Sequence, residues 1–148
     1  MLLEEFENTS AVIEPTDTSI RGGGETCNTL ILSFNGEIIK RVAELENVYE
    51  GGALHNLNAR SPWYIYEESG VRVGVMLASI GASMIVGNLE ELKAKGFQNF
   101  IVFGTCGVLD RSIAVDKIIL PSSALRDEGT SYHYAPASDE ISYHSELL

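Results

Sequence analysis

A helical repeat of apolar residues lies between two short apolar runs in the middle of this chain. The first run covers residues 71–78, and the second covers residues 100–103. Between them, Gly96 stands where a helix would stop. Apolar side chains recur at the spacing of one helix face at Ile85, Val86, Leu89 and Leu92. A helix between two apolar runs is typical of a layered α/β fold, and we expect residues 100–103 to form a buried parallel strand.

A second strand and helix precede this segment. Residues 29–33 form an apolar run, and Asn35-Gly36 interrupts it. Apolar residues then repeat at helical spacing at Ile38, Ile39, Val42 and Leu45. We therefore expect a strand followed by a helix.

A predicted hairpin makes the sheet mixed. Residues 63–67 and 71–78 flank the short turn Ser69-Gly70, which indicates an antiparallel pair. Residues 117–120 predict one more strand. The fold class we expect is α/β, with a mixed central β-sheet flanked by helices.

The charge balance limits the partners. Acidic residues outnumber basic residues 21 to 10, which gives a formal net charge of −11. Phosphate backbones require a basic face, so we expect no nucleic-acid partner. Two cysteines provide neither a disulfide framework nor a zinc-ligand spacing, so we expect a reducing, cytoplasmic location and no metal. No apolar run approaches the roughly 18 residues that span a bilayer, so we expect no membrane association.

The length predicts one domain, residues 1–148. Residues 1–26 are rich in polar and turn-forming residues and include the triplet Gly22-Gly23-Gly24. This segment is either an extended leader or a segment that packs against the body of the domain.

A candidate ligand site follows the second apolar run. Gly104, Thr105, Cys106 and Gly107 form a small turn at the carboxyl end of the strand expected at residues 100–103. Glycines let backbone N–H groups approach a phosphate or a ribose closely. The alternative is an ordinary turn that needs glycine for its dihedral angles.

A second motif, Arg-Asp-Glu-Gly-Thr-Ser-Tyr-His-Tyr-Ala-Pro, lies at residues 126–136. Together with the turn at residues 104–107, it resembles the nucleoside phosphorylase family, and within it the uridine-phosphorylase-like members. In that family a Gly-Thr-x-Gly turn holds phosphate beside the ribose, and a Gly-Thr/Ala-Ser-x-His-x-x-Pro loop follows. The resemblance implies the family's fold, incomplete at the C-terminus, because members are about twice as long as these 148 residues.

The resemblance also implies roles for individual residues. It implies phosphate binding by Gly104, Thr105, Cys106, Gly107 and Arg60, with the Thr105 hydroxyl as a donor. It implies substrate-pocket positions for Ser79, Gly81, Arg126, Thr130 and His133.

Each of these assignments has a structural alternative. Arg60 could be an exposed loop arginine, and residues 79–83 could be a tight connection from a strand to a helix. His133 could be a packed, hydrogen-bonded histidine, and Arg126-Asp127 could be an internal charge pair.

Two arginines that the family uses are missing. The family's Gly-Asp-Pro-x-Arg segment corresponds here to Phe-Asn-Gly-Glu-Ile at residues 34–38, and Val102 replaces an arginine two residues before the turn glycine. Ser79 and Ser83 also replace a customary glycine and proline. Fixed positive charge binds a dianionic nucleophile, so these departures bear on phosphate use.

The activity that the resemblance implies is phosphorolysis of a nucleoside, with uridine favoured, to a free base and ribose 1-phosphate. Inorganic phosphate is then the co-substrate, no cofactor is needed, and a homo-oligomer is expected. One alternative is hydrolysis of the N-glycosidic bond by a nucleosidase-like protein. Another is a non-catalytic fragment that retains only the fold and an assembly surface.

Overall fold

The computed structural model describes residues 6–18, 23–56, 59–113 and 117–142. Contacts divide the chain into two compact units, Ala11–Thr105 and a second unit made of Met1–Ser10 with Cys106–Leu148. The expectation of a single domain stays a prediction.

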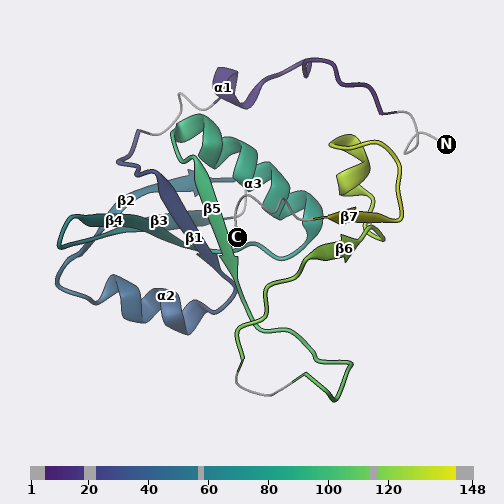
Figure 1. Ribbon diagram of the computed structural model, residues 1–148. Coiled ribbons are helices and arrows are strands. Elements are labelled where there is room, and N and C mark those ends of the chain that lie inside the picture. The colour runs from purple at the N-terminus through teal and green to yellow at the C-terminus, as the bar shows by residue number, and fades with distance from the viewer. Residues whose placement is uncertain (1–5, 19–22, 57–58, 114–116, 143–148) are drawn as a thin grey trace. The chain divides into compact units, whose positions relative to one another are not determined.

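The first unit contains a five-stranded mixed sheet (Figure 1). Its strands are β1 (Thr29–Ser33), β2 (Val48–His55), β3 (Arg60–Glu68), β4 (Val71–Leu77) and β5 (Asn99–Phe103), in the order β2-β3-β4-β1-β5. Strand β1 is parallel to both β4 and β5, whereas β2, β3 and β4 are antiparallel neighbours. The predicted mixed α/β fold is therefore confirmed.

The hairpin of β3 and β4 has the predicted turn. Ser69 and Gly70 both adopt positive φ, at 52° and 81°. Two successive residues with positive φ match the twist of a two-residue hairpin. Strand β2 was not predicted, and it pairs with β3 through a register shift between Glu50 and Gly52.

Three helices accompany this sheet. The short α1 (Pro15–Thr18) lies against α3 (Ala82–Lys95), and α2 (Gly36–Ala43) follows β1. Helices α2 and α3 cover opposite faces of the sheet (Figure 1). Helix α3 ends at Gly96, whose φ of 124° favours glycine, as predicted for the helix stop. No helix within the described ranges is long and apolar enough to cross a membrane.

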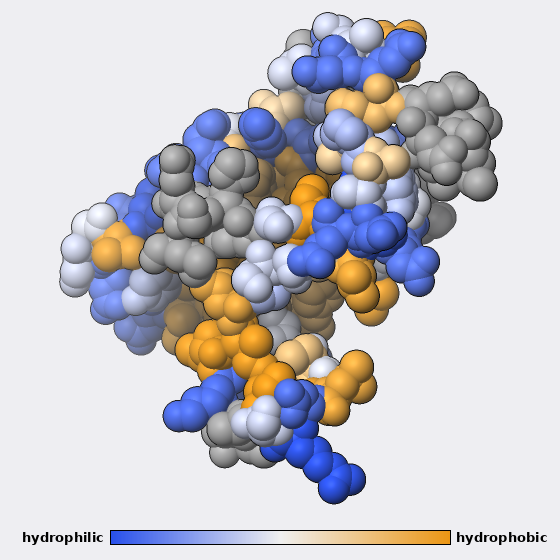
Figure 2. Space-filling view, turned by 45° about the vertical axis from the view of Figure 1, so that its right-hand side comes forward, coloured by the Kyte–Doolittle hydropathy of each residue, from blue (hydrophilic) through white to orange (hydrophobic). Residues whose placement is uncertain are grey.

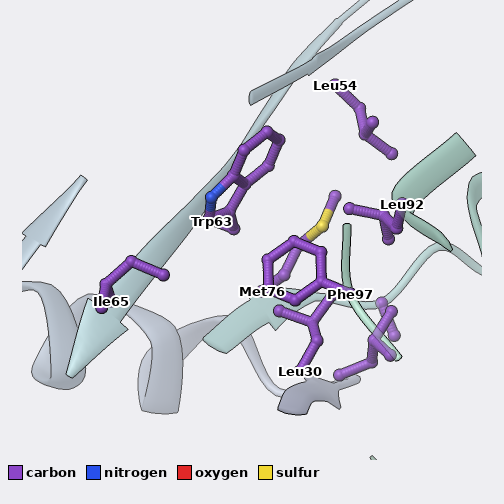
Figure 3. Close-up of a cluster of buried hydrophobic side chains, with 9 residues drawn as sticks. Leu30, Leu54, Trp63, Ile65, Met76, Leu92 and Phe97 are labelled. Atoms are coloured by element: carbon purple, nitrogen blue, oxygen red, sulfur yellow. The ribbon is translucent and has the colours of Figure 1, made fainter. Parts of the chain in front are cut away.

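The main core lies between the sheet and α3 (Figure 3). The Trp63 and Phe97 rings meet edge to face, with centroids 5.8 Å apart. The Trp63 indole Nε1 donates a hydrogen bond to the Glu25 carbonyl at 2.8 Å, which satisfies its buried polar group. The other members of the cluster are Leu30, Leu32, Leu54, Ile65, Met76, Ala78 and Leu92. All of these residues belong to the first unit.

Strand β5 is parallel, as predicted, but the expectation that it is buried is wrong. Ile101 is 53% exposed, and Val102 and Phe103 are each 50% exposed. Among the described residues β5 pairs only with β1, so it is an edge strand and lacks a neighbour on its other side. Figure 2 also shows hydrophobic residues, in orange, at the surface of the molecule.

The second unit contains a two-stranded antiparallel sheet, β6 (Ser123–Leu125) with β7 (Glu140–Ser142). A short 3-10 helix, η2 (Thr130–His133), lies between them in the chain. The strand predicted at residues 117–120 is absent from the described part of the chain. Ile118 is 93% exposed there, and a β-strand needs a hydrogen-bonding neighbour that the described residues do not give this run.

Candidate functional site

A cavity of about 370 Å³ opens at the carboxyl ends of β1 and β5. The two strands are parallel, so the segments that follow them start at the same edge of the sheet. The Phe34 N–H donates to the Phe103 carbonyl at 3.3 Å and holds the two segments together. The cavity is lined by Ser33, Phe34, Asn35, Gly36, Glu37, Ile38, Phe103, Gly104 and Thr105. All of these residues belong to the first unit.

One wall of this cavity is the N-terminus of α2. Asn35 is the N-cap, and its side-chain Oδ1 accepts the Glu37 N–H at 2.9 Å. The Asn35 N–H in turn donates to the Ser33 hydroxyl at 3.2 Å. The remaining N–H groups of a first helical turn have no partner within the helix, and the helix dipole places partial positive charge there. This end of α2 therefore favours a ligand that accepts hydrogen bonds.

The cavity lining also contains two of the predicted residues, Gly104 and Thr105. A Cβ atom at Gly104 would lie 2.9 Å from Cδ2 of the Phe34 ring, so a larger residue would displace that ring. Glycine at position 104 is therefore explained by the close approach of Phe34. Thr105 follows at the cavity wall, where its hydroxyl can donate to a ligand.

The charged side chain that lines the cavity is acidic. Glu37 is part of the lining, and the described lining residues include no Lys, Arg or His. The Lys40 ammonium lies 2.6 Å from the Glu37 carboxylate, and both side chains are more than 70% exposed, at 71% and 72%. A phosphate in the cavity would meet a carboxylate that this neighbouring lysine offsets in part.

Arg60 forms an ion pair with Glu50 on the neighbouring strand β2, away from β5. It lies at the start of β3, and its guanidinium donates to both carboxylate oxygens of Glu50 on β2. The pair lowers the pKa of Glu50 and raises the pKa of Arg60. Strands β4 and β1 separate β3 from β5, so Arg60 does not line the cavity. Its role in phosphate binding stays a prediction.

Ser79 and Gly81 lie in the connection from β4 to α3. The Asn88 amide donates to the Ser79 hydroxyl at 2.8 Å. Gly81 is the N-cap of α3 with φ of 102°, a conformation that favours glycine, and the Ile85 N–H donates to its carbonyl. This is a tight strand-to-helix connection, and its role at a substrate pocket stays a prediction.

The other predicted residues belong to the second unit. Cys106 is exposed, and a Cβ atom at Gly107 would meet nothing within 4 Å. The predicted four-residue turn therefore has its first two residues in one unit and its last two in the other, and its action as a single anion site stays a prediction.

The loop at residues 126–136 is organised by its arginine. Arg126 is buried, and its guanidinium bonds to Ser131, Ser138 and two carbonyls of the same unit. The described ion pairs include none between Arg126 and Asp127, so the prediction of an internal charge pair is wrong. His133 is exposed at the end of η2, so the alternative of a packed histidine is wrong as well.

Residues 34–38 line the cavity but were not predicted from the sequence as site residues. The sequence indicated a strand end and a helix start in this segment, together with a missing arginine, but not a ligand site, yet the segment supplies five of the nine lining residues. A signal was present, because an Asn-Gly pair between a strand and a helix places a helix N-terminus at the carboxyl end of that strand. In the described ranges, no three His, Cys, Asp or Glu side chains come together as metal ligands.

Comparisons with known proteins agree with this fold. The family model described as "Phosphorylase superfamily" matches residues 29–148. The uridine phosphorylase of Treponema pallidum (strain Nichols) is 38% identical over 64 residues, which cover 43% of this chain and 25% of that protein.

Two solved structures of uridine phosphorylase from Vibrio fischeri ES114 are also similar. One, complexed with 6-hydroxy-1-naphthoic acid, has a TM-score of 0.61 and 26% identity, covering 75% of this chain and 44% of that one. The other has a TM-score of 0.62 and 22% identity, covering 88% of this chain and 52% of that one, and shows the fold alone. This chain therefore spans about half the length of these solved relatives or less. The family match over residues 29–148 shows that the chain belongs to the phosphorylase superfamily.

Proposed function

We propose that this chain forms the phosphate side of a nucleoside phosphorylase site, with a uridine-type nucleoside as substrate and phosphate as co-substrate. The observation that carries the proposal is the cavity that Thr105 and the N-terminus of α2 line together. Family membership and the uridine phosphorylase relatives support the same activity. A cytoplasmic location and a homo-oligomer belong to the proposal, and it needs no cofactor.

The cavity residues would bind and orient the nucleophile. N–H groups at the start of α2 and the Thr105 hydroxyl donate hydrogen bonds to phosphate oxygens. As the bond between the sugar C1′ and the base breaks, positive charge develops on the sugar, and a phosphate oxygen bonds to C1′ from the opposite face. The products are the free base and ribose 1-phosphate. Orientation and electrostatic stabilisation lower the barrier without a covalent intermediate.

Glu37 favours a second candidate function, hydrolysis of the same N-glycosidic bond. A carboxylate at the cavity weakens the binding of a phosphate dianion through like-charge repulsion. The same carboxylate can accept a proton from a water molecule that attacks the sugar. In a nucleosidase-like protein, the missing arginines are no disadvantage because the nucleophile is neutral.

The first experiment is a titration of the chain with inorganic phosphate, followed by backbone amide shifts. We expect weak binding, on the order of millimolar, with shifts at residues 34–38, Gly104 and Thr105. The Thr105→Val variant removes one donor to a charged group, a contribution of about 1.5–3 kcal/mol, so binding should weaken by roughly ten- to a hundredfold.

The matched control is Thr29→Val. Thr29 begins β1, at the end of the strand away from the cavity, and undergoes the same chemical change. It should leave phosphate binding unchanged. Shifts confined to other parts of the chain, or equal affinities for Thr105→Val and the parent chain, would contradict a phosphate site in this cavity.

Product analysis separates the two functions. The chain is incubated with uridine, with and without phosphate, and the sugar product is identified. Release of uracil that requires phosphate and yields ribose 1-phosphate supports phosphorolysis. Release without phosphate that yields free ribose supports hydrolysis. Release of uracil in neither condition would favour the non-catalytic alternative for these residues.

A further inference from the structure

Arg126 is a buried cation whose described partners include no carboxylate. It is only 6% exposed. Its Nε donates to the Ser131 hydroxyl at 2.9 Å, and its Nη1 donates to the Ser138 hydroxyl at 2.8 Å and to the Pro136 carbonyl at 2.5 Å. Its Nη2 donates to the Ala135 carbonyl at 3.1 Å. Burial of a charge is costly unless hydrogen bonds compensate it, and here neutral oxygens of the same loop do so.

The backbone and the aromatic neighbour of Arg126 add three more links. The Arg126 N–H donates to the Asp139 carbonyl at 2.9 Å, and the Arg126 carbonyl accepts the Tyr132 hydroxyl at 3.0 Å. The guanidinium carbon lies 4.3 Å from the centre of the Tyr132 ring, a cation–π distance. One residue thus holds residues 131–132, 135–136 and 138–139 together.

Glu128 holds the other end of the same loop. Its carboxylate accepts the Thr130 N–H at 2.9 Å and the Ser131 N–H at 3.1 Å, at the start of η2. The first turn of η2 is therefore held by an anion, and the carbonyls after η2 are held by the Arg126 cation. Opposite charges at the two ends fix the path of the loop from both sides.

We infer that Arg126 is a positioning residue, which fixes the backbone of residues 129–136 so that Thr130 and His133 are held in one conformation for a nucleoside ligand. The inference rests on the proposed function, because the resemblance that implies a nucleoside substrate is also what implies substrate-pocket positions for Thr130 and His133. His133 is exposed, whereas Arg126 is buried, and the described hydrogen bonds of Arg126 are all to residues of its own unit. The arginine therefore acts through the loop and need not touch the ligand.

The first measurement tests whether Arg126 holds the loop. Hydrogen exchange of arginine Nε–H groups should be much slower at Arg126 than at the exposed Arg111, because a bonded, buried N–H exchanges only when the loop opens. The Arg126→Met variant should raise amide exchange at residues 130–135 and leave residues 29–33 unchanged, because the core cluster lies in the other unit. Arg111→Met, the same change at an exposed position, should raise neither.

The second measurement is a titration with uridine, followed at the Thr130 and His133 amides. Arg126→Met should weaken the binding of uridine by about tenfold or more, because part of the binding free energy is then used to order the loop. Arg126→Lys should recover part of the affinity. Lysine keeps the charge, but one ammonium cannot reach Ser131 and the carbonyls of Ala135 and Pro136 at the same time.

The outcomes distinguish the inference from the function on which it rests. Protected Arg126 Nε–H with no uridine shifts at Thr130 or His133 would overturn the nucleoside role, and with it the positioning of these residues for a nucleoside. Uridine binding that Arg126→Met leaves equal to that of Arg111→Met would overturn the positioning role and leave the proposed function standing. Weaker binding in Arg126→Met, with partial recovery in Arg126→Lys, supports both.

Discussion

Glu37 is the residue whose charge bears most directly on the choice between phosphate and water. It lines the cavity at the N-terminus of α2, where an anion would otherwise be favoured. Its carboxylate is paired with Lys40, one turn further along the helix. The sequence contains both residues, but only the fold places this pair beside Thr105.

We predict that Glu37→Gln strengthens phosphate binding. The change removes a like charge and releases Lys40 from its ion pair, so both effects favour an anion. Two unit charges about 4 Å apart in bulk water interact by about 1 kcal/mol, so the affinity should rise roughly fivefold. A phosphate titration at low ionic strength measures it, and the gain should shrink as salt is added.

Glu44→Gln is the control for Glu37→Gln, because it makes the same change in net charge. Glu44 is the exposed C-cap at the far end of α2 and does not line the cavity. Equal gains in the two variants would mean that phosphate responds to net charge rather than to the cavity.

At the scale of the element, local turn signals predicted the strands more reliably than burial patterns did. The hairpin of β3 and β4 was predicted because Ser69-Gly70 stands between two strand-like runs. Strand β2 was missed because Gly51 and Gly52 interrupt its pattern. A Cβ atom at Gly52 would lie 2.4 Å from Cζ2 of Trp63, so these glycines make room for an indole that arrives from the neighbouring strand.

The wrong predictions at residues 100–103 and 117–120 share one cause, which is that a strand's neighbours cannot be read from its own sequence. Both runs are rich in β-forming residues, yet the burial of a strand depends on which neighbours the topology supplies. Two of the nine residues that line the cavity, Gly104 and Thr105, were predicted as site residues, because they follow a recognisable strand. The lining residues from Ser33 to Ile38 were not, because the pairing of β1 with β5 joins segments that are distant in sequence.

The η2 element should depend on pH through Glu128. Hydrogen bonds with Ser131 and with the N–H groups of Ser131 and Thr130 lower the pKa of Glu128 below its ordinary value of 4.5. The folded pKa is thus lower than the unfolded one. The stabilisation by Glu128 is therefore present above pH 4.5 and is lost as the pH falls through the lowered folded pKa.

A pH titration of the Thr130 and Ser131 amide shifts measures this dependence. We expect a transition centred below pH 4.5, the ordinary carboxyl pKa, and no such transition in Glu128→Gln. Glu140→Gln, at an exposed position of β7, should keep the transition. A transition that survives in Glu128→Gln would assign the pH dependence to another group.

At the scale of the whole molecule, the exposed β5 predicts self-association. Its five residues, Asn-Phe-Ile-Val-Phe, carry no charge, and uncharged apolar edge strands pair readily with other strands. The net charge of −11 opposes close approach of two chains. We therefore expect association that increases with both protein concentration and salt, as measured by light scattering.

Ile101→Lys should reduce this association, because a charge on an edge strand opposes pairing. Val71→Lys is the control, since Val71 is 55% exposed and begins β4, which lies inside the sheet. A monomer at every concentration and salt level would contradict the prediction. Equal effects of the two lysines would show that β5 is not the contact.

The position of β1 in the sheet has a consequence for the order in which the chain can fold during synthesis. The ribosome makes β1 before the other four described strands of this sheet, and both of its neighbours, β4 and β5, are made later. Thr29 of β1 can pair with Val73 only after β4 is made, and with Asn99 only after β5 is made. In contrast, β3 and β4 are joined by a two-residue turn and can pair as soon as they emerge from the ribosome. The hairpin should therefore form first. Until residues 99–103 are translated, β1 has one free edge, and the wall of the cavity that Gly104 and Thr105 provide does not yet exist.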